Sequence, residues 1–315
     1  MGFFARIVRW FRSLFRGCRR RSSVVRAESG SHAEENFVPA VELPLGDLLT
    51  NYNAANVHSR DFNCLYDNET DTYYFGRQSL RRLSGFIDSF FTPFDELRHA
   101  ADVARARGED VAKVIEEWHA ANEEAKEAGR VLHSNLERIL LRQLQSVPFS
   151  FRYSGAYVRV SRPYSLVPEI NQLLEFSRAY KIRPYRTLWN VYDEKAALVT
   201  RLDLLATDED GRFMLVDIVR SNKIGHEVDG GFALDSSRIH GYGLGFLSHV
   251  PDSEYYRISL RLSVASRILS EHYSINVEQT SILFVHSSFK TFHLVPSAPL
   301  NDVVSDVLYD AYVTR

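Results

Sequence analysis

The sequence predicts an α/β fold in which helices flank a central β-sheet. Residues 197–220 contain two apolar, β-prone runs around the acidic turn Asp208–Gly211, and an Asp-Gly dipeptide between such runs is a strong hairpin signal. Long helical patterns precede this hairpin, and an apolar stretch typical of a buried helix follows it, before a further strand. Strands and helices that alternate along a chain are typical of an α/β domain.

Before the central hairpin, the sequence predicts one short hairpin and two helices. Residues 57–75 contain two β-prone segments on either side of the polar dipeptide Asn68-Glu69, a pattern typical of a hairpin. Phe94 to Arg107 and Asp110 to Gln145 have helical periodicity. We expect the second helix to break near Gly129, because glycine weakens a helix interior.

After the central hairpin, we expect a buried helix, a strand and a final helix. Thr280 to His286 is apolar and β-prone, and Asn301 is placed to cap an amphipathic helix that runs through Tyr312. The buried helix is indicated by five apolar residues at helical spacing: Leu260, Leu262, Val264, Ile268 and Leu269.

Length, charge and cysteine content limit the class of protein. The chain has 315 residues, 45% of them hydrophobic, which suits one large domain or two small ones. The formal net charge is −2, but residues 1–26 hold eight arginines and no acid, so the rest of the chain carries −10. An acidic body argues against a long electrostatic track for duplex DNA. Cys18 and Cys64 fit neither a disulfide framework nor a zinc site, so we expect a reducing, cytoplasmic compartment.

Residues 1–21 have the pattern of a basic amphipathic helix. The aromatic and aliphatic side chains fall on one half of the helix and the arginines on the other. This pattern is typical of a helix in a lipid headgroup layer, so we expect peripheral binding to an anionic membrane surface. The alternatives are an organelle transit peptide, a recognition helix for nucleic acid or a partner groove, and a solvated tail. Residues 22–50 are expected to be a linker and 51–315 the main domain.

Two pairs of polar residues are candidates for a functional site. Folding the central hairpin about its turn brings Asp203 level with Asp217, to within a residue or so. Carboxylates embedded in apolar strands are costly unless they are compensated, usually by a divalent cation; the alternative is two solvent-facing aspartates on an edge hairpin. His133 and Glu137 are four residues apart on one helix face, a spacing that by itself usually means a surface contact.

The central hairpin resembles the metal-binding core of the PD-(D/E)XK nuclease superfamily. In that family the hairpin reads roughly Gly-Thr-Ile-Asp-Leu-Leu, a turn, and Leu-Ile-Asp-Trp-Lys. Here the segments read Thr-Arg-Leu-Asp-Leu-Leu at residues 200–205 and Leu-Val-Asp-Ile-Val at residues 215–219. The segment with Gly129, His133 and Glu137 likewise resembles the family helix Gly-Thr-x-x-His-x-x-x-Glu.

Further segments occur in the order found in a phage and bacterial subgroup of the superfamily, which is RecB-like or lambda-exonuclease-like. The resemblance covers roughly residues 57–295, and the order of the motifs carries it more than any single motif does. The additional matching segments are Phe90 to Asp95, Trp118, Gly243 to Asp252, Tyr255-Tyr256 and Arg267 to Tyr273.

The resemblance implies a restriction-endonuclease-like fold with a mixed central sheet, and hydrolysis of DNA phosphodiesters with Mg²⁺ or Mn²⁺. It assigns Asp203, Asp217 and Glu137 as metal ligands, with His133 as a positioning residue or further ligand. One or two Mg²⁺ ions held by carboxylates activate water and neutralise phosphate oxygens. Because Mg²⁺ keeps several waters, few protein ligands suffice.

Four positions depart from the family pattern. Val219 occupies the place of the motif lysine, and Leu188 replaces a glutamate found before the hairpin in many relatives. Arg261 stands where a helix glutamine is usual, and Ala265 where a tyrosine is. Loss of one transition-state donor typically costs about a hundred- to a thousandfold in rate, so the resemblance implies a degenerate site with weakened or lost activity.

Arg261 has two interpretations. It can project toward the same cleft and replace the missing lysine cation from another element, or it can be a surface arginine paired with one of the many acids. Arginine is a fixed cation but a poor substitute where an ammonium must hold a water. The alternative to a nuclease is therefore a catalytically inactive nuclease-fold binding protein, held at a membrane surface by residues 1–21.

Overall fold

The computed structural model describes residues 51–229 and 231–315. The chain divides into two units, Met1–Leu43 and Pro44–Arg315, and the described residues all belong to the second. The predicted amphipathic helix over residues 1–21 and the linker over residues 22–50 lie outside the described residues. Among the described helices, none combines the length and the apolar character needed to cross a membrane.

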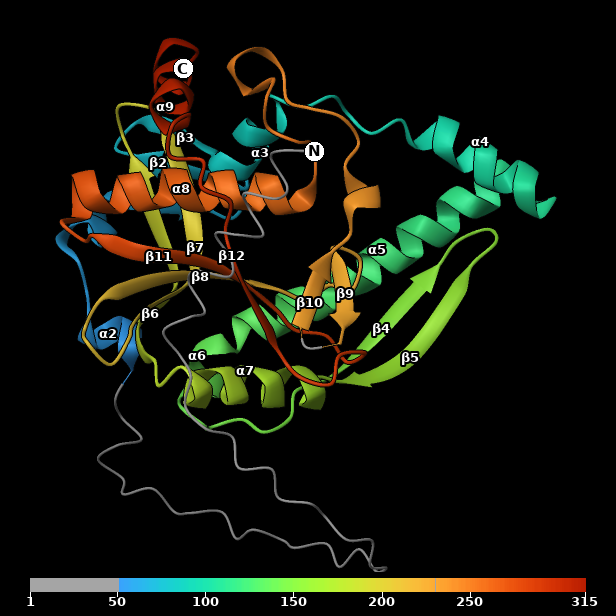
Figure 1. Ribbon diagram of the computed structural model, residues 1–315, viewed down its shortest axis with the longest axis horizontal. Helices are drawn as coiled ribbons and strands as arrows, with labels where there is room; N and C mark the ends of the chain where they lie inside the picture. The colour runs from blue at the N-terminus through green and yellow to red at the C-terminus, as the bar shows by residue number, and fades with distance from the viewer. Residues whose placement is uncertain (1–50, 230) are drawn as a thin grey trace, which may run out of the picture. The chain divides into compact units, whose positions relative to one another are not determined.

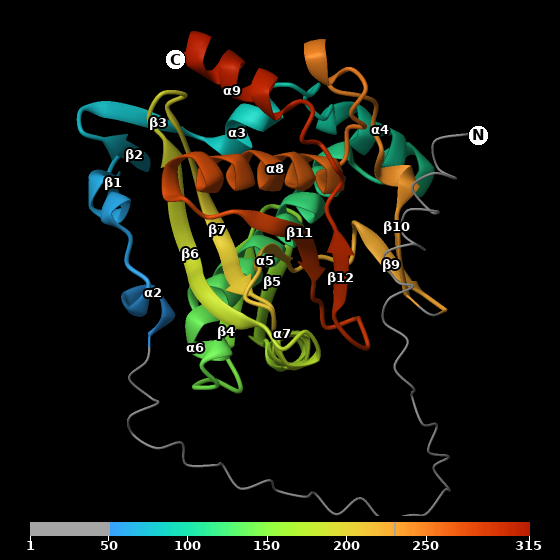
Figure 2. The ribbon, with the colours of Figure 1, turned by 60° about the vertical axis from the view of Figure 1, so that its left-hand side comes forward.

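The described residues form an α/β fold around a mixed eight-stranded sheet. Figures 1 and 2 show helices on both sides of its central strands. The β3–β7 and β8–β11 pairs are parallel, and the other pairs of this sheet are antiparallel. This confirms the predicted α/β class with a mixed central sheet. In spatial order the strands are β1 (Cys64–Asp67), β2 (Thr72–Phe75), β3 (Gln78–Arg82), β7 (Leu198–Thr207), β8 (Phe213–Val219), β11 (Val277–Phe284) and β12 (His293–Pro296), with β6 (Arg183–Asp193) paired to β7.

Helices pack on both faces of the sheet. Strand alternation turns Leu215 toward one buried cluster and Val216 toward the other, so each face has its own core. The Leu215 face is covered by α3 (Leu83–Asp88), α8 (Glu254–Tyr273) and α9 (Val304–Val313), and the Val216 face by α5 (Val111–Ser134), α6 (Leu136–Leu140) and α7 (Val167–Ala179).

A helical and hairpin arm extends beyond the sheet (Figure 1). Its helix α4 (Glu96–Arg107) packs against α5, and the hairpin of β4 (Pro148–Ser154) and β5 (Arg159–Ser165) lies along α5. The side chains of Asp95 and Asp110 cap α4 and α5, and Gly108 ends α4 at φ +68°. The remaining elements are α2 (Tyr52–Ala55), β9 (Gly225–Val228), β10 (Gly231–Leu234) and the 3-10 helices η3 (Ser59–Asn63), η4 (Ser236–Arg238) and η5 (Gly245–Leu247).

Two predicted helix boundaries are wrong. Helix α5 continues through Gly129 and ends at Ser134, because the side chain of Asn135 donates to the Val131 carbonyl at 2.8 Å and Asn135 leaves the helical conformation at ψ 4°. Helix α9 is not capped by Asn301, since residues 301–303 form a turn and the cap residue Val303 has no side-chain cap bond.

Candidate active site

Strands β7 and β8 separate where each carries an aspartate. Their last paired residues are Leu204 and Val216, so Asp203 and Asp217 occupy the next level of the hairpin, as the sequence predicts. In place of a main-chain bond at this level, the Oδ2 atom of Asp203 accepts a hydrogen bond of 2.9 Å from the Ile218 N–H. A carboxylate therefore bridges the two strands as they diverge.

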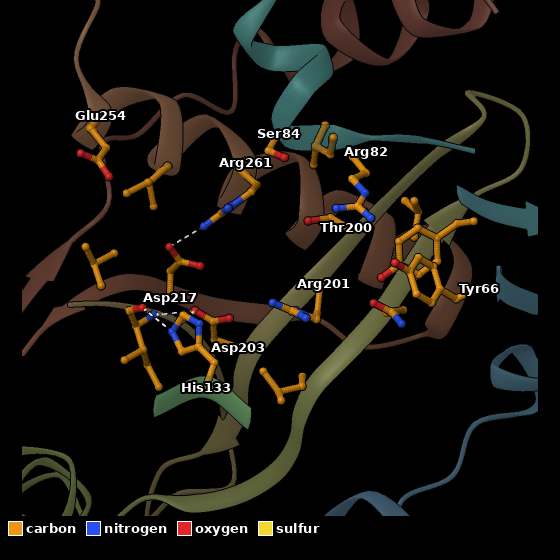
Figure 3. A pocket seen from close by; sticks show the side chains of 18 of the residues that line it. Tyr66, Arg82, Ser84, His133, Thr200, Arg201, Asp203, Asp217, Glu254 and Arg261 are labelled. Atoms are coloured by element: carbon orange, nitrogen blue, oxygen red, sulfur yellow. Dashed lines mark hydrogen bonds and ion pairs between the residues drawn. The ribbon is translucent and has the colours of Figure 1, made fainter. Parts of the chain in front are cut away.

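The separation leaves one edge of β7 partly unpaired. Strand β6 pairs along the whole of one edge, so β3 and β8 must share the other. Strand β3 reaches only Leu198 and Val199, and β8 begins at Leu204, so residues 200–203 pair with neither strand. This gap opens into a pocket of about 700 Å³, which is shown in Figure 3.

Both aspartates are buried and face the α8 side of the sheet. Only 7% of Asp203 and 4% of Asp217 are exposed. Alternation places Asp203 with Leu205, and Asp217 with Leu215, in the cluster beneath α8. The two carboxylates therefore share one face and line the same pocket.

Arg261 of α8 lies against Asp217, with its Nη2 atom 2.5 Å from Asp217 Oδ2 (Figure 3). Burial raises the pKa of Asp217 to about 6, and the nearby Asp203 carboxylate adds to this shift, while Arg261 and His133 oppose it. The Asp217 carboxylate in turn raises the pKa of Arg261. One cation thus compensates only part of the negative charge that the strands bring together.

His133 enters from α5, on the opposite side of the sheet from α8. Its Nε2 atom is 2.8 Å from the Ile218 carbonyl oxygen and 3.6 Å from Asp203 Oδ2. Because a carbonyl oxygen only accepts hydrogen bonds, Nε2 carries the hydrogen and donates it. That nitrogen is consequently not a free metal ligand, and His133 acts on the site by holding the backbone next to Asp217.

The structure does not bring Glu137 to the two aspartates. Glu137 belongs to α6, beyond the break at Asn135, so it no longer shares a helix with His133. Its Oε1 atom accepts a hydrogen bond of 3.1 Å from the Asn53 N–H, and Asn53 in turn accepts one of 2.8 Å from the Thr187 N–H. Glu137 thus joins α6 to α2, and Asn53 joins α2 to β6. Glu137 does not line the pocket.

Only some of the positions that depart from the family pattern line the pocket. Val219 and Leu188 both line the pocket, so apolar side chains stand where the resemblance implies a lysine and a glutamate. Leu188 lies opposite Asp203 and has φ +49°, a left-handed conformation that non-glycine residues adopt at a cost. Ala265 is a buried residue of α8 that packs into the core and does not line the pocket.

Several residues that line the pocket are not among the candidates predicted from the sequence. Arg201 lies two residues before Asp203, so strand alternation alone can place both on one face. Glu254 lies seven residues before Arg261, two turns earlier on the same helix face, and burial raises its pKa. Arg82 and Asn190 come from β3 and β6, and only the tertiary structure brings those strands to the pocket.

A second charged cluster lies outside the pocket. Among the described residues, one group of three potential metal ligands has all its donor atoms within 4.8 Å: Asp193, Glu194 and His272. Glu194 Oε2 is 2.5 Å from Arg60 Nη2, and Asp193 Oδ1 accepts hydrogen bonds from the N–H groups of Lys195 and Ala196. The expected ligand set of Asp203, Asp217 and Glu137 does not form such a group.

The pocket still suits a cation that needs few protein ligands. Mg²⁺ is commonly held by one or two carboxylates, with waters and substrate phosphates in the remaining positions. Asp203 and Asp217 supply two carboxylates next to open space. The donor chemistry of the pocket therefore fits Mg²⁺ or Mn²⁺ without Glu137.

Comparison with known proteins adds no identification. No family model and no curated protein matches this chain. A solved structure titled "Crystal structure of SSO0001" is similar over 74% of this chain and 84% of its own, with 9% identity and a TM-score of 0.26. A likeness at that score carries no argument about fold or function.

Proposed function

We propose that the pocket between β3, β7 and β8 is a divalent-metal-dependent phosphodiesterase site of the PD-(D/E)XK nuclease kind, acting on DNA with weakened turnover. The observation that supports this proposal best is the placement of Asp203 and Asp217. They are two buried carboxylates at one level of a hairpin, beside a pocket of about 700 Å³. Such a pair has excess negative charge, which a divalent cation compensates well.

Asp203 and Asp217 would hold the Mg²⁺ or Mn²⁺, which when bound activates a water and neutralises phosphate oxygens. The protein's own contribution is to position charge. His133 fixes the Ile218 carbonyl, and the Ile218 N–H fixes Asp203. Arg261 adds a permanent positive charge on the α8 side of the pocket, where it can bind a phosphate oxygen.

Val219 limits this chemistry. A lysine at this point of β8 would face the pocket and donate to the attacking water or to the developing charge, whereas valine has no polar group. Loss of one such donor costs about 100- to 1000-fold in rate. We therefore propose that cleavage is slow, with Arg261 restoring charge but not the lost water contact.

The second candidate function is a catalytically inactive nuclease-fold binding or interaction protein, held at an anionic membrane surface by residues 1–21. The ion pair between Arg261 and Asp217 favours it, because the guanidinium already occupies one carboxylate oxygen that a metal would use. The apolar side chains of Leu188 and Val219 at the pocket wall favour it as well.

A cleavage assay separates the two candidates. Purified full chain is incubated with supercoiled DNA and Mg²⁺ or Mn²⁺, beside Asp217→Asn, Val219→Lys and the control Val219→Leu. We expect slow metal-dependent nicking by the wild type, a loss of at least 100-fold in Asp217→Asn, and a gain of about 10- to 1000-fold in Val219→Lys only. Thermal unfolding midpoints check that each variant is folded.

Two outcomes contradict the enzyme. Equal nicking by the wild type and Asp217→Asn would show that the cleavage comes from a contaminant. If neither the wild type nor Val219→Lys nicks the DNA although both still bind it, the inactive binding protein is favoured.

A further inference from the structure

We propose that the wall of the pocket away from Asp217 binds an unstacked nucleobase, so that the site accepts DNA as a single strand. This inference rests on the proposed function for the nature of the ligand. It concerns other residues, namely Tyr66, Tyr73, Asn190 and Arg201, all of which line the same pocket. In the view of Figure 3, Arg201 lies between the aspartates and Tyr66.

Tyr66 and Tyr73 form an aromatic platform. They are direct partners in the β1–β2 hairpin, with ring centroids 4.7 Å apart, and 43% of Tyr66 is exposed. The Tyr66 hydroxyl donates to Asp71, which also pairs with Arg82, and the Arg82 guanidinium lies 5.6 Å from the Tyr73 ring centre. The rings are therefore held in place before a ligand arrives, and a base that stacks on Tyr66 costs little ordering entropy.

Asn190 has an unused hydrogen-bonding atom in this pocket. Within the described residues, its Oδ1 atom is buried and has no partner. Buried polar atoms are nearly always paired, so an exception requires an explanation. An amide presents a donor and an acceptor side by side, which matches the edge of a base such as adenine. Because Asn190 lines the pocket, rotation of its amide group would turn this oxygen toward a base bound at Tyr66, which would supply the missing partner.

Arg201 is placed to hold the backbone of the same nucleotide. It lies directly across from Asn190 in the β6–β7 pairing, and it is exposed. No hydrogen bond or ion pair of its side chain occurs within the described part of the chain. At two residues from Asp203, it is about 7 Å along the strand from the carboxylate pair. A guanidinium in this position is free to bind phosphate.

The size and charge of the pocket favour a single strand over a duplex. A volume of about 700 Å³ is typical of pockets for small organic ligands, and it accommodates a nucleotide rather than a double helix. A paired base would have to leave its stack and lose its pairing to reach Tyr66, which costs free energy that an unpaired strand does not spend. Residues 27–315 carry a formal charge of −10, which gives no long basic track for a duplex.

The test compares two single strands of equal length and phosphate charge, one ordinary and one with every base removed. Fluorescence anisotropy in EDTA measures their binding to the full chain, so electrostatic binding by the arginines of residues 1–26 contributes equally to both. We expect the ordinary strand to bind about 5- to 150-fold more tightly, the range found when one stacking residue is removed. A duplex of the same length should bind more weakly than the ordinary strand.

Variants locate the effect. Tyr66→Ala and Asn190→Ala should bring the two single strands closer in affinity, whereas Arg201→Gln should weaken both equally. The matched control Tyr309→Ala, at an exposed tyrosine of α9 outside the pocket, should change nothing. Equal binding of both strands by the wild type, tighter binding of the duplex, or a base preference that survives both Tyr66→Ala and Asn190→Ala would overturn the proposal.

The outcome is separable from that of the proposed function. A base preference without metal-dependent cleavage would leave the base subsite standing and remove the enzyme. If cleavage depends on Asp217 but the two single strands bind equally, the enzyme is supported and the base subsite is removed.

Discussion

Two clusters in this protein contain the same kinds of charged side chains but differ in the pKa shifts of their carboxylates. The pocket cluster comprises Asp203, Asp217, His133 and Arg261, and the β6-end cluster comprises Asp193, Glu194, His272 and Arg60. Each thus combines two carboxylates, one histidine and one arginine. The β6-end cluster has the tighter set of potential metal ligands, so composition and distance alone would make it the better metal site.

The clusters differ in how far nearby positive charge offsets the burial of a carboxylate. Burial acts to raise the pKa of Glu194, but Arg60, a backbone hydrogen bond and His272 together outweigh burial, so the pKa is lowered. Arg60 is itself fixed between two aromatic rings, 4.2 Å from the Tyr192 centre and 5.1 Å from that of Tyr273. In the pocket cluster, burial wins and the pKa of Asp217 is raised to about 6.

The pocket cluster is the better candidate for a metal site, because its uncompensated negative charge lies next to open space. The β6-end cluster uses its charges to join η3, β6 and the end of α8, and a metal there would have to displace Arg60. The pocket cluster opens onto about 700 Å³ and keeps negative charge that the protein does not neutralise. We therefore propose the pocket cluster, and not the β6-end cluster, as the metal site.

The largest expected difference between the two clusters is in metal affinity. In calorimetry with Mn²⁺, Asp203→Asn should weaken binding by at least about 10- to 100-fold, since even an outer-shell change has that effect. His272→Gln, the matched change in the β6-end cluster, should leave binding unchanged. Asparagine at position 203 still offers an oxygen to the Ile218 N–H, so the fold is kept. The reverse pattern would place the metal at the β6-end cluster.

The pH dependence of stability should differ between the clusters. The pKa of Asp217 is higher in the folded chain, at about 6, than the usual 3.8. Its stabilising contribution is therefore complete below about pH 4 and is lost as the pH rises through 6, on the order of 3 kcal/mol. Urea unfolding from pH 4 to 8 should show this fall in the wild type and not in Asp217→Asn. A difference between the two proteins that does not vary with pH would contradict it.

The smallest effect is expected at Arg60. Arg60→Gln removes a partly exposed ion pair and the contacts with Tyr192 and Tyr273, which together are worth about 1 to 2 kcal/mol at pH 7. Because the pKa of Glu194 is lowered, its contribution is present above the usual glutamate pKa and is lost as the pH falls. Thermal unfolding of Arg60→Gln should thus approach the wild type in acid. An equal loss at pH 4 and pH 7 would mean that only the aromatic contacts matter.

Much of the local structure was predictable from short-range patterns. The acidic turn and strand alternation set the level of Asp203 and Asp217, which the pairing of Leu204 with Val216 confirms. The β1–β2 hairpin, α4 and α8 also lie where the sequence predicts them, because turn residues and apolar periodicity act within a few residues. The nuclease resemblance stays a prediction, since no family model bears on it.

The wrong predictions arise where a side-chain contact competes with the local helix pattern. Asn135 ends α5 by bonding to the preceding turn, and this removes Glu137 from the helix face of His133. Residues 148–193, for which we predict no strand or helix from the sequence, form β4, β5, α7 and β6. Without β6, neither Asn190 nor the left-handed Leu188 could be placed beside Asp203.

Residue order alone predicts that the two aspartates lie at one level of a hairpin, and it shows valine in place of the motif lysine at position 219. The tertiary structure decided which side chains meet them, because β3, α5 and α8 approach the separated strands from three distant parts of the chain. Contacts of this kind depend on packing across the sheet and not on spacing along the chain. Arg261 therefore reaches Asp217 and Glu137 does not, although the sequence presents both as candidates.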